Sequence, residues 1–133
     1  MLLEPLPPRR RLPWRRILLL ASPVALTLLV MVPIWADDLR LADMKDRLLA
    51  HPLPPETSFG AAGAQGSVGV QEGNGDHCDF LVRFSLLTRL SEAELTSYYD
   101  RIDGRVYFQD GDPASAVVEV LETDDAGWDL RCR

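Results

Sequence analysis

The sequence predicts an α+β protein: an N-terminal transmembrane helix, then a small antiparallel sheet with one helix packed on it, in the order β-β-α-β-β-β. Three observations lead to this prediction. An uncharged apolar run covers residues 17–35. Short segments of alternating polar and apolar residues follow it, and a capped amphipathic segment lies between them. The length of 133 residues allows one small domain with attachments.

The charge is distributed unevenly along the chain, whose net charge is −6. Residues 1–16 carry five arginines and one glutamate, whereas residues 37–133 carry nine basic and 19 acidic residues. This acidic balance argues against a nucleic-acid partner. Two cysteines without a nearby histidine pair exclude a structural zinc site. We therefore expect the two ends of the chain to lie in different environments.

The apolar run is long enough to cross a bilayer as a helix. A basic tail over residues 1–16 precedes it, and two aspartates follow it. The basic residues of this tail are Arg9, Arg10, Arg11, Arg15 and Arg16. Because positive charge stays on the cytoplasmic side, the pattern predicts a single-pass protein of the cell membrane with a cytoplasmic N-terminus and an extracytoplasmic C-terminal domain.

Two features of the run favour a retained anchor over a cleaved signal peptide. Pro23 and Pro33 lie near its two ends, where they would kink a membrane helix rather than forbid it. A signal peptidase site would fall at Ala36, but Ile34 and Trp35 before it are poor matches to the small residues that such a site requires. Cleavage there, which would release a secreted domain, is the alternative.

Residues 36–50 place Leu41, Met44 and Leu48 at helical spacing among charged residues. They predict a juxtamembrane helix that continues the membrane helix as a spacer packed on the domain. A dimerising coiled coil or a surface for a membrane partner is the alternative. Prolines end this helix, and residues 51–66, rich in proline and glycine, are expected to form a linker to the domain of residues 67–133.

Residues 66–71 and 77–87 are predicted to form a hairpin. Alternation in the second segment places five side chains on the core face, namely Cys78, Phe80, Val82, Phe84 and Leu86. Opposed residues of an antiparallel pair point the same way, so we expect a loop of three or five residues centred on Gly75. This register sets Val70 opposite Phe80, with a glycine at positive φ in the loop.

The helix after the hairpin is the best-specified local element. Ser91 is expected to be its N-cap, and Glu94 completes a capping box. Leu90 and Leu95 occupy the positions of a hydrophobic staple. The apolar stripe continues to residue 102, and its aromatic pair at residues 98–99 is interpreted as core rather than as the lining of a ligand groove.

Three strands are predicted after the helix, over residues 106–108, 116–121 and 127–133, the second of them central. In the last strand Trp128, Leu130 and Cys132 are expected to face inward. Cys78 and Cys132 then both face the core, so we expect them to form a disulfide between antiparallel neighbouring strands. An exported location is oxidising. Closing a loop of about 55 residues stabilises by up to about 4 kcal/mol in the chain-entropy model.

No catalytic residue, metal or cofactor is predicted. His77 and Asp79 flank Cys78 in a strand and therefore point away from it, so neither can serve as the base for a nucleophilic thiol. Acidic turns at residues 110–112 and 123–125, and a cluster that includes Asn74 and Asp76, lack the spacing of a calcium loop. A weak Ca²⁺ site is the alternative.

Four segments carry a family resemblance: residues 53–58 (LPPETS), 73–80 (GNGDHCDF), 90–95 (LSEAEL) and 127–132 (GWDLRC). They resemble a family of uncharacterised single-pass membrane proteins of actinobacteria, which have a short basic N-terminus and a small exported domain. The resemblance covers roughly residues 37–133. It implies the location and the disulfide, and it implies no catalytic residue.

The sequence thus predicts a membrane-tethered extracytoplasmic module of the cell envelope that binds or interacts, with an envelope protein as a possible partner, rather than an enzyme. An accessory subunit of an envelope enzyme is the alternative. A concave pocket lined by convergent polar residues would favour a ligand, whereas a flat sheet face with exposed apolar residues would favour a protein partner.

Overall fold

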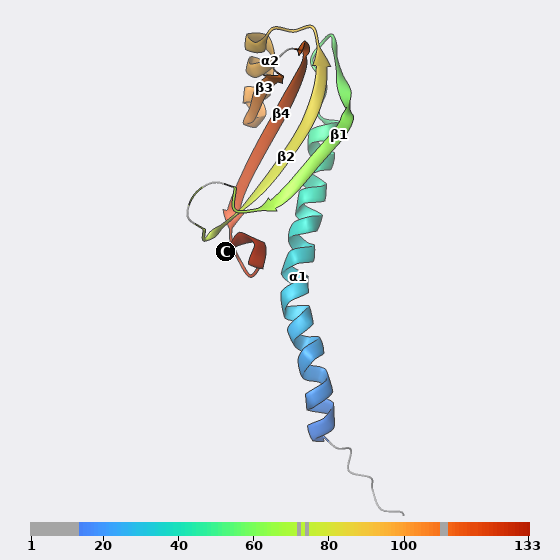
Figure 1. Ribbon diagram of the computed structural model, residues 1–133, viewed down its shortest axis with the longest axis vertical. Coiled ribbons are helices and arrows are strands. Elements are labelled where there is room, and N and C mark those ends of the chain that lie inside the picture. Colours follow the sequence, from blue (N-terminus) through green and yellow to red (C-terminus); the bar gives the residue numbers. More distant parts are fainter. Residues whose placement is uncertain (1–13, 72, 74, 110–111) are drawn as a thin grey trace, which may run out of the picture.

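The computed structural model describes residues 14–71, 73, 75–109 and 112–133, without the side chains of residues 15–17, 20 and 113. A long helix, α1 (Trp14–Ala50), leads into a four-stranded antiparallel sheet of order β1-β2-β4-β3 (Figure 1). The strands are β1 (Thr57–Gly69), β2 (His77–Thr88), β3 (Gly104–Gln109) and β4 (Asp112–Asp125). The remaining elements are α2 (Glu92–Tyr99) and the 3₁₀ turns η1 (Asp100–Ile102) and η2 (Leu130–Cys132). The predicted α+β class with an antiparallel sheet is confirmed.

Helix α1 is continuous, with Pro23 and Pro33 inside it. Its N-terminal part projects away from the sheet, and its C-terminal part lies alongside β1 and β2 (Figure 1). Within the residues that the structure describes, no helix combines the length and the hydropathy needed to cross a membrane.

The C-terminal part of α1 belongs to the core of the domain. Met44 is 1% exposed, and Leu41 and Leu48 pack against the same cluster. The Arg40 guanidinium lies 4.5 Å from the centre of the Phe80 ring. Residues 36–50 therefore pack on the domain as predicted, in one helix with the segment before them.

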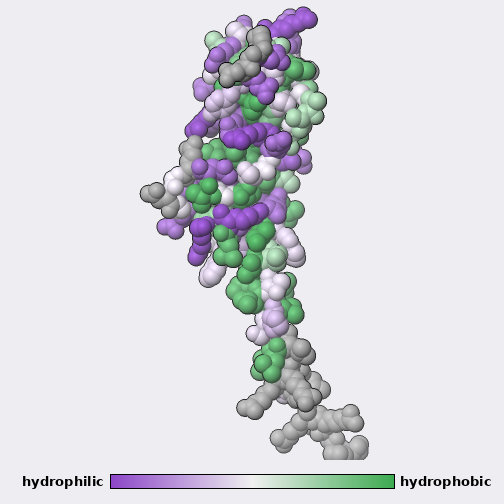
Figure 2. All heavy atoms as spheres, viewed as in Figure 1, coloured by the Kyte–Doolittle hydropathy of each residue, from purple (hydrophilic) through white to green (hydrophobic). Residues whose placement is uncertain are grey.

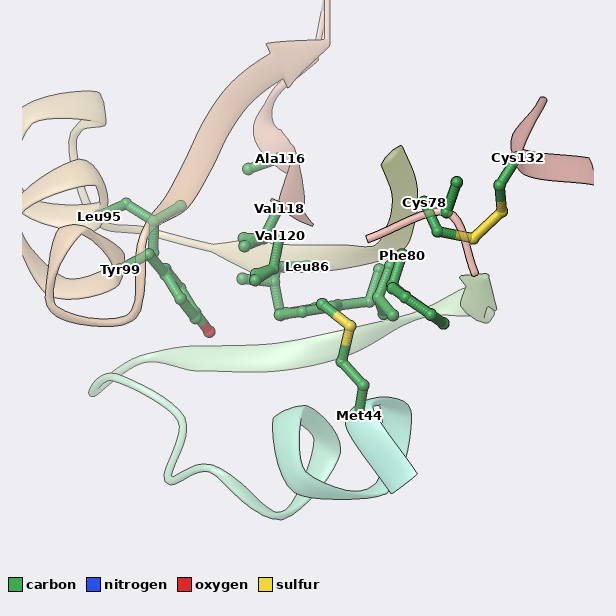
Figure 3. Close-up of a cluster of buried hydrophobic side chains, with 13 residues drawn as sticks. Met44, Cys78, Phe80, Leu86, Leu95, Tyr99, Ala116, Val118, Val120 and Cys132 are labelled. Carbon is green, nitrogen blue, oxygen red and sulfur yellow. A yellow bond between two sulfur atoms is a disulfide. The ribbon is translucent and has the colours of Figure 1, made fainter. Parts of the chain in front are cut away.

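The core lies between the sheet and the two helices. All five side chains predicted for the core face of β2 are at most 2% exposed. Met44 from α1 and Leu95 and Tyr99 from α2 converge on them and on β4 (Figure 3). The residues of β4 in this cluster are Ala116, Val118 and Val120. Both helices therefore cover the same face of the sheet.

The first strand is longer than predicted. β1 begins at Thr57, so residues 57–66 are strand rather than linker. Val68, not Val70, lies opposite Phe80, and the loop spans residues 70–76 instead of three or five residues. The side chains of both strands still lie on the faces predicted for them, because a shift of two residues keeps the alternation of side chains between the two faces. Glycines at positive φ lie in the loop as expected, at residues 73 and 75.

The predicted last strand is wrong. Residues 127–133 form no ladder; Gly127 has φ 52°, which turns the chain away from the sheet, and η2 follows. Trp128 and Leu130 are exposed rather than inward-facing, whereas Asp129 is buried. On the side away from β1, β2 pairs with β4 and not with residues 127–133. β4 also includes residues 123–125, which were predicted as a turn. The sheet consequently has four strands, not five.

The local prediction for α2 agrees with the structure. Ser91 Oγ accepts a hydrogen bond from the Glu94 amide, and the Ser91 amide donates to Glu94 Oε2 at 2.9 Å. The Ser91 hydroxyl also donates to Glu94 Oε2, at 2.6 Å. This hydrogen bond, followed by the one from the Ser91 amide, lowers the pKa of the Glu94 carboxyl. The helical path ends at Asp103, which adopts a left-handed conformation.

Candidate functional site

The candidate site lies on the face of the sheet opposite α1 and α2. One row of side chains crosses all four strands there, because Arg83 of β2 pairs with Gln65 of β1 and with Glu119 of β4, and Glu119 in turn pairs with Arg105 of β3. Core side chains occupy the alternate positions of the same strands. The alternation that builds the core thus also builds this polar row.

A groove of about 430 Å³ runs beside the row. Its wall on the β1 side includes Ala62 and Gly63, in the irregular segment where the β1–β2 register shifts. The polar side chains that line it come from all four strands: Gln65, Arg83, Ser85, Tyr107, Gln109 and Glu119. This volume is within the range of small-molecule sites.

The groove is polar but its central charges are paired. Arg83 donates to Glu119 Oε1 from Nη2 at 2.8 Å and from Nε at 3.0 Å. Gln109 Oε1 accepts from Ser115 Oγ at 3.1 Å, so its NH₂ group remains a donor. Among the described residues, the side chains of Gln65 and Tyr107 have no hydrogen-bond partner. The groove therefore offers uncommitted donors and acceptors without a strong net charge.

Ser85 lies under the edge of this groove. Its Oγ is buried without a hydrogen-bond partner in the described part of the chain. A Cβ at Gly60 of β1 would collide with this oxygen. Glycine at position 60 thus lets β1 approach β2 closely enough to close off the hydroxyl.

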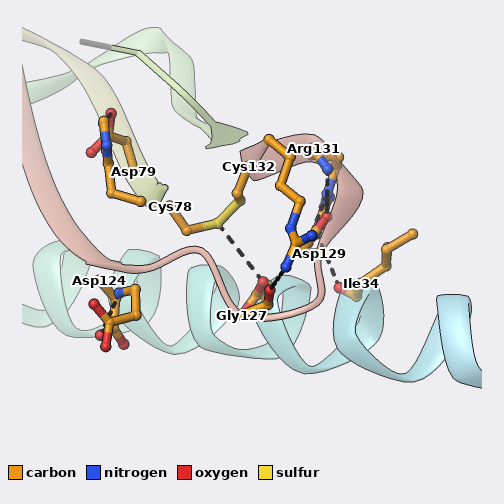
Figure 4. The surroundings of a disulfide bond; sticks show 12 residues. Ile34, Cys78, Asp79, Asp124, Gly127, Asp129, Arg131 and Cys132 are labelled. Atoms are coloured by element: carbon orange, nitrogen blue, oxygen red, sulfur yellow. Dashed lines mark hydrogen bonds and ion pairs between the residues drawn. A yellow bond between two sulfur atoms is a disulfide. The ribbon is translucent and has the colours of Figure 1, made fainter. Parts of the chain in front are cut away.

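The predicted cysteine pair is present at the opposite end of the sheet. Cys78 at the start of β2 and Cys132 in η2 are bonded, with Cα atoms 4.9 Å apart (Figure 4). The disulfide was predicted correctly, but the expected reason for it, two antiparallel neighbouring strands, was wrong. Cys132 arrives on a short turn rather than on a neighbouring strand.

Beside the disulfide, Arg131 fastens η2 to α1. It donates to Asp38 Oδ1 at 2.7 Å and to the Ile34 carbonyl at 3.2 Å, and it binds both carboxylate oxygens of Asp129 (Figure 4). Hydrogen bonds from Arg131 lower the pKa of Asp129. Burial, followed by the hydrogen bond with Asp129 and the charge of that residue, raises the pKa of Asp37. Of the two carboxyls, that of Asp37 is therefore the easier one to protonate.

The same junction groups four possible metal donors. The sulfurs of Cys78 and Cys132 and carboxylate oxygens of Asp37 and Asp129 all lie within 4.8 Å of one another. The two sulfurs are bonded to each other, and Arg131 occupies both oxygens of Asp129. We therefore assign these residues to the junction and not to a metal site.

The remaining predicted positions lie apart from the groove. His77 Nε2 is 3.2 Å from Asp79 Oδ2, and the Asp79 carboxylate also accepts from Thr123 Oγ1 at 2.7 Å. Arg9, Arg10 and Arg11 lie outside the described residues, as do the side chains of Arg15 and Arg16. Asn74, Asp110 and Gly111 of the turns considered for calcium are outside them too.

The chain was compared with protein families, curated proteins and solved structures. No protein-family model, curated protein or solved structure matches the chain. The resemblance to actinobacterial single-pass membrane proteins thus stays a prediction.

The groove was not found by sequence reasoning, although part of its signal was available. Arg83 and Glu119 are single charged residues within apolar strand segments, and residues 105, 107 and 109 are polar at every second position. Such alternation predicts one exposed sheet face. Which of these residues meet depends on the pairing of strands distant in the sequence, and that pairing cannot be read from any one strand.

Proposed function

We propose that the protein is a membrane-tethered module of the cell envelope that binds a ligand in the groove on its open sheet face. The observation that carries the proposal is the groove of about 430 Å³ whose polar lining comes from all four strands. Binding is favoured over catalysis because the acidic group of the groove, Glu119, is committed to Arg83.

The tether in this proposal is the segment of residues 17–35. It contains no charged residue. Several of its side chains are exposed although apolar, among them Leu19 at 74%, Leu26 at 64% and Leu29 at 59%. The described part of α1 below the sheet is mostly green or pale, whereas purple dominates much of the sheet region (Figure 2). Exposed apolar surface of this kind favours an apolar environment such as lipid.

The orientation follows from the flanking charges. Five arginines precede the apolar segment, and Asp37 and Asp38 follow it, which favours a cytoplasmic N-terminus and an exported sheet. A phosphatase fused after Arg133 should then be active outside the cytoplasm, and a fluorescent protein that matures only in the cytoplasm should be dark there. The reverse pattern would contradict the tether and its direction.

Binding is tested separately from location. The full chain, in lipid nanodiscs, is labelled with 3-fluorotyrosine, and the Tyr107 resonance is assigned by its loss in Tyr107→Phe. A ligand of any class that shifts this resonance, but not that of the buried Tyr99, supports the proposal. The absence of any shift across panels of peptides, oligosaccharides and small organic ions would reject the groove as a binding site.

A further inference from the structure

We propose that the ligand of the groove is a carbohydrate: an uncharged, hydroxyl-rich chain of sugar units. This inference rests on the proposed binding function and specifies the class of ligand. Three properties of the groove support it, namely its exposed aromatic ring, its planar amide groups and its internally neutralised charges.

The aromatic ring is that of Tyr107. Its side chain is 48% exposed and lines the groove from β3. A sugar ring has one face of C–H groups that stacks on an aromatic face, whose partial negative charge attracts those hydrogens. A purely apolar ligand would instead need an apolar lining, and most of the lining residues here are polar.

The amide groups are those of Gln65 and Gln109, which lie on opposite edge strands. Each primary amide carries two N–H donors and one carbonyl acceptor in one plane. Neighbouring hydroxyls of a sugar each donate and accept, so such a planar group can satisfy two of them together. Gln109 keeps its donors free because its carbonyl already accepts from Ser115.

The charges argue against an ionic ligand. Arg83 and Glu119, which both line the groove, form an ion pair at 2.8 Å. An acidic ligand would compete with Glu119 for Arg83, and a cationic ligand would compete with Arg83 for Glu119. An uncharged ligand can accept from or donate to the pair without separating it, and charge-assisted hydrogen bonds of this kind are the stronger ones.

The shape favours a chain over a single small molecule. A second hollow of about 130 Å³ shares Arg83 and Glu119 with the groove, and a third of about 210 Å³ shares Gln65 and Arg83. Hollows that share lining residues are neighbours on the same face. Consecutive units of an extended polymer could occupy them in turn.

The experiment uses the fluorotyrosine-labelled full chain in nanodiscs with matched hexameric probes. Cellohexaose, maltohexaose and chitohexaose represent uncharged sugars, and hexaglutamate and hexalysine represent the two charged alternatives. We expect at least one hexasaccharide to shift the Tyr107 resonance saturably and neither peptide to do so. Calorimetry with that sugar then provides the affinity of each variant.

Tyr107→Ala and Gln65→Ala should each weaken binding by about tenfold, equivalent to about 1.4 kcal/mol. Tyr107→Phe should retain most of the affinity because it keeps the stacking ring. Thr96→Ala, on the exposed side of α2, is the control and should bind as the wild type does. Both groove positions are exposed, and unchanged melting temperatures will show that the variants remain folded.

The outcomes separate the two proposals. If a charged peptide shifts the Tyr107 resonance and no sugar does, the carbohydrate assignment is overturned while the binding function stands. If a sugar binds with the same affinity to Tyr107→Ala and Gln65→Ala, the carbohydrate does not occupy this groove. If no probe of any class changes the resonance, both proposals fail.

Discussion

Ser91 has a single local task, which makes it the simplest residue to test. Its Oγ accepts from the Glu94 amide at the start of α2, so Ser91→Ala leaves that amide without its acceptor. We expect a loss of about 1 kcal/mol in the free energy of unfolding. Glu94→Ala breaks the same box, so the double variant should lose less than the sum of the two single losses. Chemical denaturation of the four proteins measures this coupling.

Asp37 links stability to pH at the junction of α1 and η2. Its folded-state pKa is raised, first by burial and then by Asp129, although the charges of Arg131 and Arg40 oppose the shift. The stabilisation from its proton is therefore fully present below the unfolded pKa and is lost as pH rises through the folded pKa. Asp129, whose pKa is lowered, acts in the opposite sense and loses its contribution as pH falls.

We therefore expect the wild-type denaturation midpoint to fall as pH rises above the unfolded pKa of an aspartate. Asp37→Asn should remove that fall, because an amide cannot ionise and can still donate to Asp129. Asp46→Asn removes the same charge from an exposed position of the same helix and is the matched control. Equal pH profiles for wild type and Asp37→Asn would show that no proton is shared at the junction.

At the scale of elements, the disulfide joins the start of β2 to η2. Cys78→Ser and Cys132→Ser should each destabilise the domain by up to about 4 kcal/mol in the chain-entropy model. The double variant should be little worse than either, since all three lack the same bond. Non-reducing mass spectrometry of the wild type should show one intramolecular bridge. Two reactive thiols in the native protein would contradict the expectation.

The close approach of β1 to β2 is set by Gly60. Gly60→Ala should destabilise by about 1–3 kcal/mol, as overpacking does, because the new Cβ meets Ser85. Ser85→Ala alone should cost little, because the hydroxyl it removes has no partner among the described residues. Gly66→Ala in the same strand is the comparison: its new Cβ would lie 3.1–3.2 Å from the branched end of Leu41, a less severe contact than that with Ser85, so a smaller loss is expected. Equal losses at both glycines would mean that β1 adjusts freely.

The elements that sequence reasoning located are those whose signals are local. The alternation of β2 and the capping box of α2 depend on residues within one segment, and both are found as predicted. The first part of β1, residues 57–65, was missed because these residues are mostly small and polar, and an edge strand needs few apolar contacts. Residues 127–133 alternate like a strand, but Gly127 and the buried Asp129 redirect them into a turn.

For the whole molecule, the domain should depend on the end of α1. Leu41, Met44 and Leu48 contribute to its core from outside the sheet. A chain that begins at residue 37 should therefore unfold cooperatively, whereas one that begins at residue 51 should be far less stable, since losing one buried methionine side chain alone costs about 2–5 kcal/mol. Thermal unfolding by circular dichroism compares the two. Similar melting temperatures would show that α1 is dispensable to the fold.

Because α1 is one continuous helix, it fixes the direction in which the sheet faces around the helix axis. The helix that enters the core at Met44 is the same helix that carries the apolar segment, and each helical residue turns the chain by about 100°. One alanine inserted after residue 36 would swing the open sheet face about a quarter of a turn around the helix axis, and four would bring it back near its starting azimuth. The number of helical residues between the apolar segment and Met44 thus sets the direction in which the groove faces relative to that segment.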